Sequence, residues 1–330
     1  MVCLWPRLAL PRNFLMTLIF SIMLPILILI GVGFIAVRSG LINEAHVQGL
    51  GAFVLNFALP AVLVSAMVRQ DLTATFNVSY VAAYGLSSLV AFFLLFAVLR
   101  GLMRRPLDRA AMGALGGAMS NTGFIGFPVA SLAFGTTALA ALPMTMLVEN
   151  VLILPIAFAL VEIGAGKATS LGGVVRETAA RLIRMPLMLA IIVGLILALS
   201  GITLPAPLLK SMDMLASASA PTALFVVGGT IALLKRADMA SDIGPIVAGK
   251  LLIHPLATTA AMMLIPGIPA ELQAVGILLS SVSMITVYPI LAKRAGMDGI
   301  AAAAMICATS VALVTISVVL FLLAPAGAVG

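Results

Sequence analysis

Charged side chains are scarce in this sequence. They make up 9% of its 330 residues, whereas hydrophobic residues make up 63%. Such a composition excludes an ordinary soluble domain and indicates a helical membrane protein with several spans. The basic residues behind the net charge of +7 flank apolar ranges and form no separate patch, so the sequence does not indicate nucleic-acid binding.

Cysteine is scarce as well. Cys3 and Cys307 lie at opposite ends of the chain. Two cysteines without a ligand-like spacing support neither a disulfide framework nor a metal site. We therefore expect no metal and no cofactor.

The motifs of membrane enzymes and nucleotide-driven pumps are missing. His46 is followed by Val47 and His254 by Pro255, so neither histidine begins the His-Glu-x-x-His pattern of a metalloprotease. The Gly-x-Ser-x-Gly pattern of serine hydrolases and a nucleotide-binding loop are absent too. An intramembrane enzyme is therefore the unfavoured alternative, no catalytic residue is assigned, and energy for transport would come from gradients.

Long apolar runs are abundant instead. An even number of spans puts both termini on one side of the membrane. Thirteen of the 18 Lys and Arg residues then lie on the other side, and four lie on the side of the termini. The positive-inside rule predicts a multi-pass membrane protein with both termini outside. The ten apolar ranges, of roughly 20 residues each, are 15–37, 46–68, 78–99, 110–135, 138–161, 182–201, 211–234, 243–265, 272–292 and 299–323.

A shift of 161 residues relates the two halves of the chain. It pairs Pro128 with Pro289 and Gly135 with Gly296, and it lays the first five apolar ranges over the last five. Because each copy has an odd number of spans, the second copy crosses in the opposite sense, as in many secondary transporters. The predicted units are a first repeat at 1–161, a cytoplasmic linker at 162–184 and an inverted second repeat at 185–330.

The fourth apolar range is expected to be broken. Residues 113–135, GALGGAMSNTGFIGFPVASLAFG, combine many glycines with a polar cluster at Ser120–Thr122. Glycine weakens a helix, and Pro128 suits the first turn of a new one. We predict two half-helices around an unwound middle at 121–127, although a glycine-rich packing face with a kink is the alternative. The candidate ligand-binding residues here are Asn121, Thr122, Gly123, Gly126 and Pro128.

The ninth range repeats this pattern at Ser280–Gly296. A polar cluster again precedes a proline, Pro289, although no glycine lies between Ile277 and Tyr288. Two broken spans in corresponding positions would cross near the middle of the membrane and turn helix N-termini toward the crossing, which favours an anion. The candidate residues of this copy are Ser283, Thr286, Tyr288 and Pro289.

Three acidic or basic residues lie well inside apolar ranges. Glu149 is near the middle of its range, which indicates an ion or proton pathway; it could carry a proton or bind a coupling cation such as sodium. A buried pair with Lys250 is the alternative. Lys250 is expected to extend toward the membrane surface, and His254, before Pro255, is expected to mark a helix kink more than a proton relay.

The motif SNTGFIGFPVA resembles the fourth helix of the auxin efflux carrier family, and MITVYPILAKRAG resembles the ninth helix of its bacterial malonate-transporter-like members. The resemblance implies an all-α protein of ten transmembrane helices in two inverted five-helix repeats, with crossed broken helices 4 and 9. This fold is similar to that of bile acid/sodium symporters. It also implies an elevator-like motion, a homodimer and a substrate-binding role for Asn121.

The sequence departs from plant relatives at one position. They use an asparagine before the proline that opens the sixth helix, where this chain has Met185 before Pro186. The departure argues against auxin-like binding. The predicted function is secondary transport of a small organic anion, a carboxylate such as malonate; a channel-like anion permease and an aromatic carboxylate efflux carrier are the alternatives.

Overall fold

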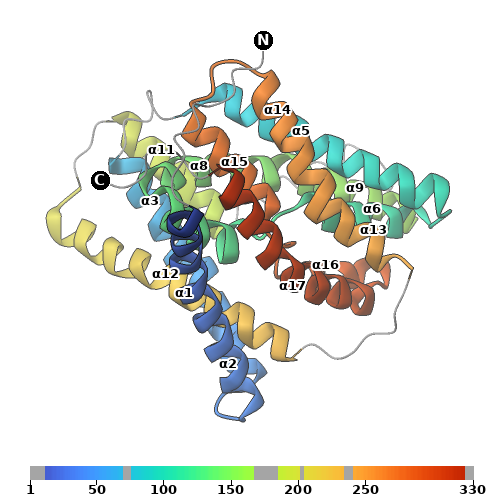
Figure 1. Cartoon of the computed structure of the whole chain (residues 1–330), viewed down its shortest axis with the longest axis horizontal. Coiled ribbons are helices and arrows are strands. Elements are labelled where there is room, and N and C mark those ends of the chain that lie inside the picture. Colours follow the sequence, from blue (N-terminus) through green and yellow to red (C-terminus); the bar gives the residue numbers. More distant parts are fainter. Residues whose placement is uncertain (1–11, 70–75, 167–184, 201–203, 234–240, 324–330) are drawn as a thin grey trace.

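The computed structural model describes residues 12–69, 76–166, 185–200, 204–233 and 241–323, with side chains from residue 24 onward (Figure 1). These residues form helices and one isolated β-bridge. Helical residues occupy each of the ten predicted ranges, and six helices are long and apolar enough to cross a membrane. The prediction of an all-helical membrane protein is confirmed, whereas ten crossings in an inverted repeat remain a prediction. Linker residues 167–184 lie outside the described part.

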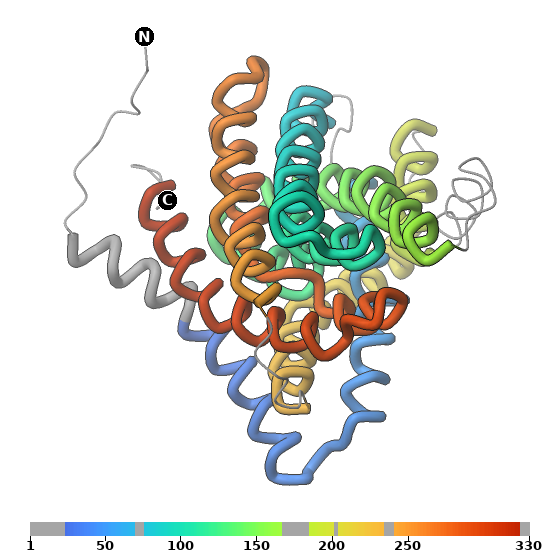
Figure 2. Tube along the Cα trace, turned by 90° about the vertical axis from the view of Figure 1, so that its right-hand side faces the viewer, coloured from blue at the N-terminus to red at the C-terminus, as the bar shows by residue number. Residues whose placement is uncertain are grey.

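One group of helices, here called the first bundle, packs around the N-terminal helix. Helix α1 lies along α12, and α3 packs against both α11 and α12 (Figure 1). Figure 2 shows the turn between α1 and α2 projecting from one end of the molecule. The first bundle consists of α1 (Arg12–Arg38), α2 (Glu44–Phe53), the π-helical turn η1 (Val54–Ala58), α3 (Leu59–Arg69), α11 (Pro186–Ser200) and α12 (Ala206–Leu233).

The remaining helices form a second bundle. Within it α14 packs along α5, α6 packs against α9, and α15 contacts both α14 and α17. Its elements are α5 (Val78–Ala97), η2 (Val98–Leu102), α6 (Leu107–Ala118), η3 (Thr122–Gly126), α7 (Phe127–Phe134), α8 (Thr136–Leu147), η4 (Val148–Ile153), α9 (Leu154–Gly164), α13 (Ile243–Ala248), η5 (Gly249–Ile253), α14 (His254–Leu264), α15 (Ala270–Ser281), α16 (Tyr288–Ala292), η6 (Lys293–Ala295) and α17 (Asp298–Leu323).

Two segments of the second bundle are broken, as predicted. Helix α6 ends before Met119, which is extended at φ −103° and ψ 124°. Helix α15 ends before Val282, which is extended at φ −73° and ψ 166°. Each segment then continues into a second α-helix with a proline in its first turn. These are Pro128 in α7 and Pro289 in α16.

The first break is shorter than predicted. The non-helical residues are 119–121, and Thr122–Gly126, expected to be unwound, form the π-helical turn η3. The backbone nitrogens of Ile125 and Gly126 donate to the carbonyl of Asn121 at 3.0 and 2.9 Å. Backbone groups away from water need such partners, so the chain returns to helical bonding as soon as it has crossed its neighbour.

Candidate functional site

The two breaks meet. Ser120 and Met284 form the antiparallel bridge, and the backbone nitrogen of Asn121 donates to the carbonyl of Ser283 at 2.8 Å. The side-chain amide of Asn121 donates to the hydroxyl of Thr286 at 2.7 Å. Asn121, Ser283 and Thr286, selected from sequence, are therefore together at one crossing.

Close contact at this crossing depends on missing side chains. A Cβ on Gly116 would lie 2.5 Å from the ring of Tyr288, and one on Gly126 would lie 2.9 Å from Leu279. The hydroxyl of Tyr288 donates to the carbonyl of Met112 in α6 at 3.2 Å. Tyr288 thus fastens one broken segment to the other, and its hydroxyl is already used.

Two polar atoms at the crossing have no partner among the described residues. They are Oδ1 of Asn121 and Oγ of Ser283. Asn121 is 3% exposed and Ser283 is fully buried. A buried polar atom without a hydrogen bond is costly, so both atoms are suited to binding a ligand or water. Of the other candidates, Gly123 lies apart: a Cβ there would meet Leu59 of the first bundle at 2.7 Å.

Glu149 lies beside the first break. It belongs to the π-helical turn η4 and is 2% exposed. Its Oε1 accepts hydrogen bonds from the hydroxyl of Thr122 at 2.8 Å, the backbone nitrogen of Ser120 at 3.2 Å and the hydroxyl of Tyr84 at 3.3 Å. The hydroxyl of Thr122 is therefore directed to this carboxylate, which links the polar cluster of the first segment to an ionisable group.

Lys250 lies on the other side of Ser120 from Glu149. The expectation that Lys250 extends to the membrane surface is wrong. It is fully buried. Its Nζ donates to Oγ of Ser120 at 2.6 Å and to the carbonyl of Ser280 at 2.8 Å, and it lies 2.8 Å from Nδ1 of His254. An ammonium has three protons to donate, and three acceptors surround this one. Internal partners thus replace the solvent that an extended lysine would seek.

His254 does more than mark a kink. Its Nε2 lies 3.0 Å from the hydroxyl of Ser88, and its ring is fully buried. If Lys250 donates to Nδ1, then Nε2 carries the proton and donates to Ser88. The sequence also did not select Tyr84 and Ser88. Lys250 and His254 are one helical turn apart in the apolar run KLLIH, which is the signal that could have selected both as one site.

Ser120 separates the two charged groups. Its backbone nitrogen binds Glu149 and its hydroxyl accepts from Lys250, while no ion pair of the described residues joins Glu149 to Lys250 directly. The alternative of a direct buried pair is therefore not observed. Of the two broken segments, the carboxylate contacts only the first, whereas the ammonium contacts both through Ser120 and Ser280, so the two groups would respond differently to a change at the crossing.

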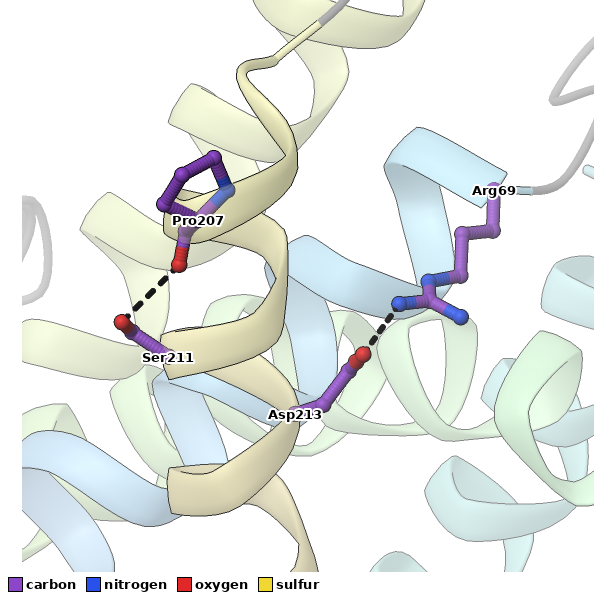
Figure 3. A network of polar contacts seen from close by, with 4 residues as sticks. All are labelled: Arg69, Pro207, Ser211 and Asp213. Atoms are coloured by element: carbon purple, nitrogen blue, oxygen red, sulfur yellow. Dashed lines mark hydrogen bonds and ion pairs between the residues drawn. The ribbon is translucent and has the colours of Figure 1, made fainter.

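A cavity of about 780 Å³ lies between the two bundles. Its walls come from α3 and α12 of the first bundle and from α8 and α15 of the second, and Phe127 at the start of α7 is part of its lining. At its margin Arg69 pairs with Asp213 at 2.5 Å, and Figure 3 shows this pair beside the Ser211–Pro207 hydrogen bond of α12. The cavity thus reaches the second half of the first broken segment.

Known proteins resemble this chain along most of its length. A family model described as "Membrane transport protein" matches residues 18–320. A Rhizobium meliloti (strain 1021) protein named "Putative malonate transporter" is 27% identical over 92% of this chain and 96% of its own length. The "Uncharacterized transporter YfdV" of Escherichia coli (strain K12) is 25% identical over 74% of this chain and 78% of its own.

The similarity extends beyond bacteria. The mouse (Mus musculus) protein named "Lysosomal cholesterol signaling protein" is 27% identical over 74% of this chain, which corresponds to 30% of the mouse protein. The shared part is therefore a region of a longer chain in that relative.

Proposed function

The chain belongs to the family of membrane transport proteins that includes the auxin efflux carriers, and from this premise we propose that it is a secondary active transporter of a small organic anion. The observation that carries the proposal is the crossing of two broken helical segments with two buried polar atoms, Asn121 Oδ1 and Ser283 Oγ, that lack partners among the described residues. Crossed, broken helices are where many secondary transporters bind substrate.

The charge near the crossing supports an anionic substrate. The ammonium of Lys250 lies against Ser120 and Ser280, on both broken segments. The second half-helix, which begins as η3 at Thr122, adds the partial positive charge of a helix N-terminus. We propose a small carboxylate as the substrate, with malonate as the first compound to test because of the name of the Rhizobium meliloti relative.

We propose an elevator-like mechanism in which the second bundle carries the crossing past the first. The helices of each bundle pack mainly on one another, and the cavity lies between the bundles, which supports relative motion of the two bodies. The inverted repeat of 1–161 and 185–330 belongs to the same proposal. It is supported by α6 and α15, which both have 12 residues and both begin after a proline.

Glu149 is proposed to couple transport to a proton or to a cation such as sodium. Its carboxylate bonds to Ser120 and Thr122, the neighbours of the proposed ligand-binding residue Asn121. A ligand at the crossing and a proton or cation at Glu149 would therefore act on the same few backbone and side-chain groups. The distribution of Lys and Arg supports an orientation with both termini outside, and the bacterial relatives support a location in the bacterial inner membrane.

Counterflow tests the transporter against its alternatives. Proteoliposomes loaded with unlabelled malonate should accumulate labelled malonate transiently above its external concentration. A channel would only equalise the concentrations, and an enzyme would release a new product. Absence of any uptake by the folded protein would reject malonate as the substrate, and equalisation alone would reject the transporter.

Asn121→Ala tests the site. We expect the malonate concentration for half-maximal uptake to rise roughly tenfold or more, as is typical for loss of a hydrogen bond to a charged ligand. Asn150→Ala is the matched control, because Asn150 is buried nearby but donates to the carbonyl of Met146 in its own helix at 2.8 Å. Equal affinities of the two variants would remove Asn121 from the binding site.

Glu149→Gln tests coupling. The amide has nearly the shape of the carboxylate but cannot exchange a proton or balance a cation's charge. We expect malonate uptake by this variant to lose its response to an imposed pH gradient or to a sodium gradient, whichever drives the unaltered protein. A variant that keeps the response to both gradients would exclude Glu149 from coupling.

A further inference from the structure

Lys250 is a fully buried ammonium held by both broken segments and by its own helix. It belongs to the π-helical turn η5 (Gly249–Ile253), which leads into α14. Its Nζ donates to the hydroxyl of Ser120 at 2.6 Å and to the carbonyl of Ser280 at 2.8 Å, and it lies 2.8 Å from Nδ1 of His254. No ion pair involving Lys250 occurs in the part of the chain that the structure describes, so an ion pair does not explain its position.

The carbonyl of Ser280 is an acceptor suited to a cation. Ser280 lies in the last turn of α15, where backbone carbonyls lack partners within the helix and carry a partial negative charge. The next carbonyl, that of Ser281, accepts instead from the hydroxyl of Thr315 in α17 at 3.2 Å. The ammonium therefore binds the carbonyl that it shares a site with Ser120 of the first segment, and a neutral hydroxyl serves the other.

This set of acceptors has the composition of a small-cation site. In many transporters with broken helices, the carbonyls of unwound backbone and of half-helix ends coordinate the coupling cation. Here a hydroxyl from the first break and a helix-end carbonyl from the second converge on one point, and both serines are buried. The ammonium of Lys250, tethered to η5, lies where a free cation would bind.

A buried carboxylate nearby makes a positive charge necessary here. Glu149 is 2% exposed, and its Oε1 accepts from the backbone nitrogen of Ser120 at 3.2 Å. A charge buried without an opposite charge is costly. A cation that is covalently part of the chain compensates Glu149 at all times, whereas a dissolved ion would have to be captured from solution.

We propose that Lys250 is a resident cation: its ammonium fills a monovalent-cation site shared by the two broken segments, so this site takes no ion from solution. Shortening the side chain should open the site to a free alkylammonium ion. The inference goes beyond the proposed transport, since it assigns the occupant of a second site and not the substrate.

Chemical rescue of the purified protein tests this inference. Lys250→Ala removes the side chain beyond Cβ, and n-propylammonium has the atoms to replace what is lost. We expect the variant to melt at a lower temperature, and n-propylammonium chloride to recover about half of the loss or more, because a ligand that binds only the folded state stabilises it by mass action. n-Propanol has nearly the same shape without the charge, and at the same concentration it should recover little.

Two further variants separate charge from space. Met262→Ala is the matched cavity control, because Met262 is fully buried in α14 and its unbranched side chain is about as long as that of lysine but donates no hydrogen bond. n-Propylammonium should stabilise this variant no more than n-propanol does. When Glu149→Gln is added to Lys250→Ala, the rescue by n-propylammonium should fall several-fold, because the carboxylate that the cation compensates is gone.

Lys250→Gln separates charge from hydrogen bonding. Glutamine keeps N–H donors at a similar reach but is neutral. We expect this variant to lose melting temperature as clearly as Lys250→Met, and a failure to fold is the same loss in its strongest form. This comparison stands even if Lys250→Ala does not fold.

Three outcomes would overturn the inference. They are a Lys250→Gln variant as stable as the unaltered protein, a Lys250→Ala variant that loses no stability, and a rescue by n-propylammonium no greater than that by n-propanol. None of the measurements uses malonate. A protein that shows the rescue but does not transport malonate would therefore overturn only the proposed function.

Discussion

The two broken segments reach the same geometry with different sequences. The first, Leu107–Phe134, contains five glycines, whereas the second, Ala270–Ala292, contains only Gly276. Both nevertheless run for 12 residues as a helix, open into extended backbone and then enter a second α-helix with a proline in its first turn. Glycine content is therefore not what breaks the helices; a polar cluster followed by proline is the feature that they share.

The glycines of the first segment have another purpose. Gly116 receives the ring of Tyr288, and Gly126 receives the side chain of Leu279. The first segment has a glycine at each point where the second has a large side chain, so the two segments pack closely. The comparison shows that two segments of similar backbone course can differ in side-chain size and so complement each other.

The largest loss of stability is expected from replacing Lys250, which contacts both broken segments. Lys250→Met removes the donor to Ser120 and Ser280 and leaves Glu149 without a nearby cation. Removing one member of a set of buried charges typically costs about 3–5 kcal/mol. We expect a clear drop in melting temperature of the purified protein, and partial recovery when Glu149→Gln is added. No recovery in the double variant would mean that the two groups are energetically independent.

A smaller loss is expected where the two segments fit together. Gly116→Ala forces the added methyl group against Tyr288, and overpacking of this kind costs roughly 1–3 kcal/mol. Thermal unfolding should show the loss, and Tyr288→Leu in the same chain should restore part of it. Gly31→Ala in α1 is the control, because nothing lies within 4 Å of its added Cβ. Equal stability of both alanine variants would contradict the proposed fit.

The smallest difference in stability is expected between substitutions at Gly135 and Gly296, the glycines that follow the two broken segments. Gly135 has φ 50° and ψ −121°, which L-residues avoid, whereas Gly296 has φ 63° and ψ 35°, which asparagine tolerates. Gly135→Asn should therefore cost about 1–3 kcal/mol, and Gly296→Asn should cost less than about 1 kcal/mol. Melting temperatures of the two variants compare them directly, and a greater loss at Gly296 would show that backbone conformation is not the deciding factor.

Sequence patterns located much of the fold. Long apolar runs bounded by Gly, Pro and charged residues define helices within a few residues, as 243–265 against Ile243–Leu264 illustrates. The spacing from a polar cluster to Pro128 or Pro289 identified both breaks, including the one without glycine. It did not give the extent of the first break, because the glycines of Thr122–Gly126 favour an unwound backbone, whereas the structure has a π-helical turn there.

Contacts between distant elements were harder to predict. Asn121 and Thr286 could be placed together because the predicted repeat puts their segments in corresponding positions, and the structure brings these two side chains within 2.7 Å. Lys250 was misjudged, since its burial depends on Ser120 and Ser280, which tertiary packing brings near. Tyr288 was selected as a ligand-binding residue, and its hydroxyl instead donates to a carbonyl of α6. The sequence shows which groups can form hydrogen bonds, but tertiary packing determines which partner each group has.

The position of Ser120 has one more consequence. Its peptide nitrogen donates to the carboxylate of Glu149, but its hydroxyl can turn about a single bond, a motion that takes picoseconds to nanoseconds. The hydroxyl can therefore turn its own proton from one acceptor to another while its oxygen continues to accept from Lys250. Such a reorientation is fast compared with collective motions of packed helices, which take microseconds to milliseconds.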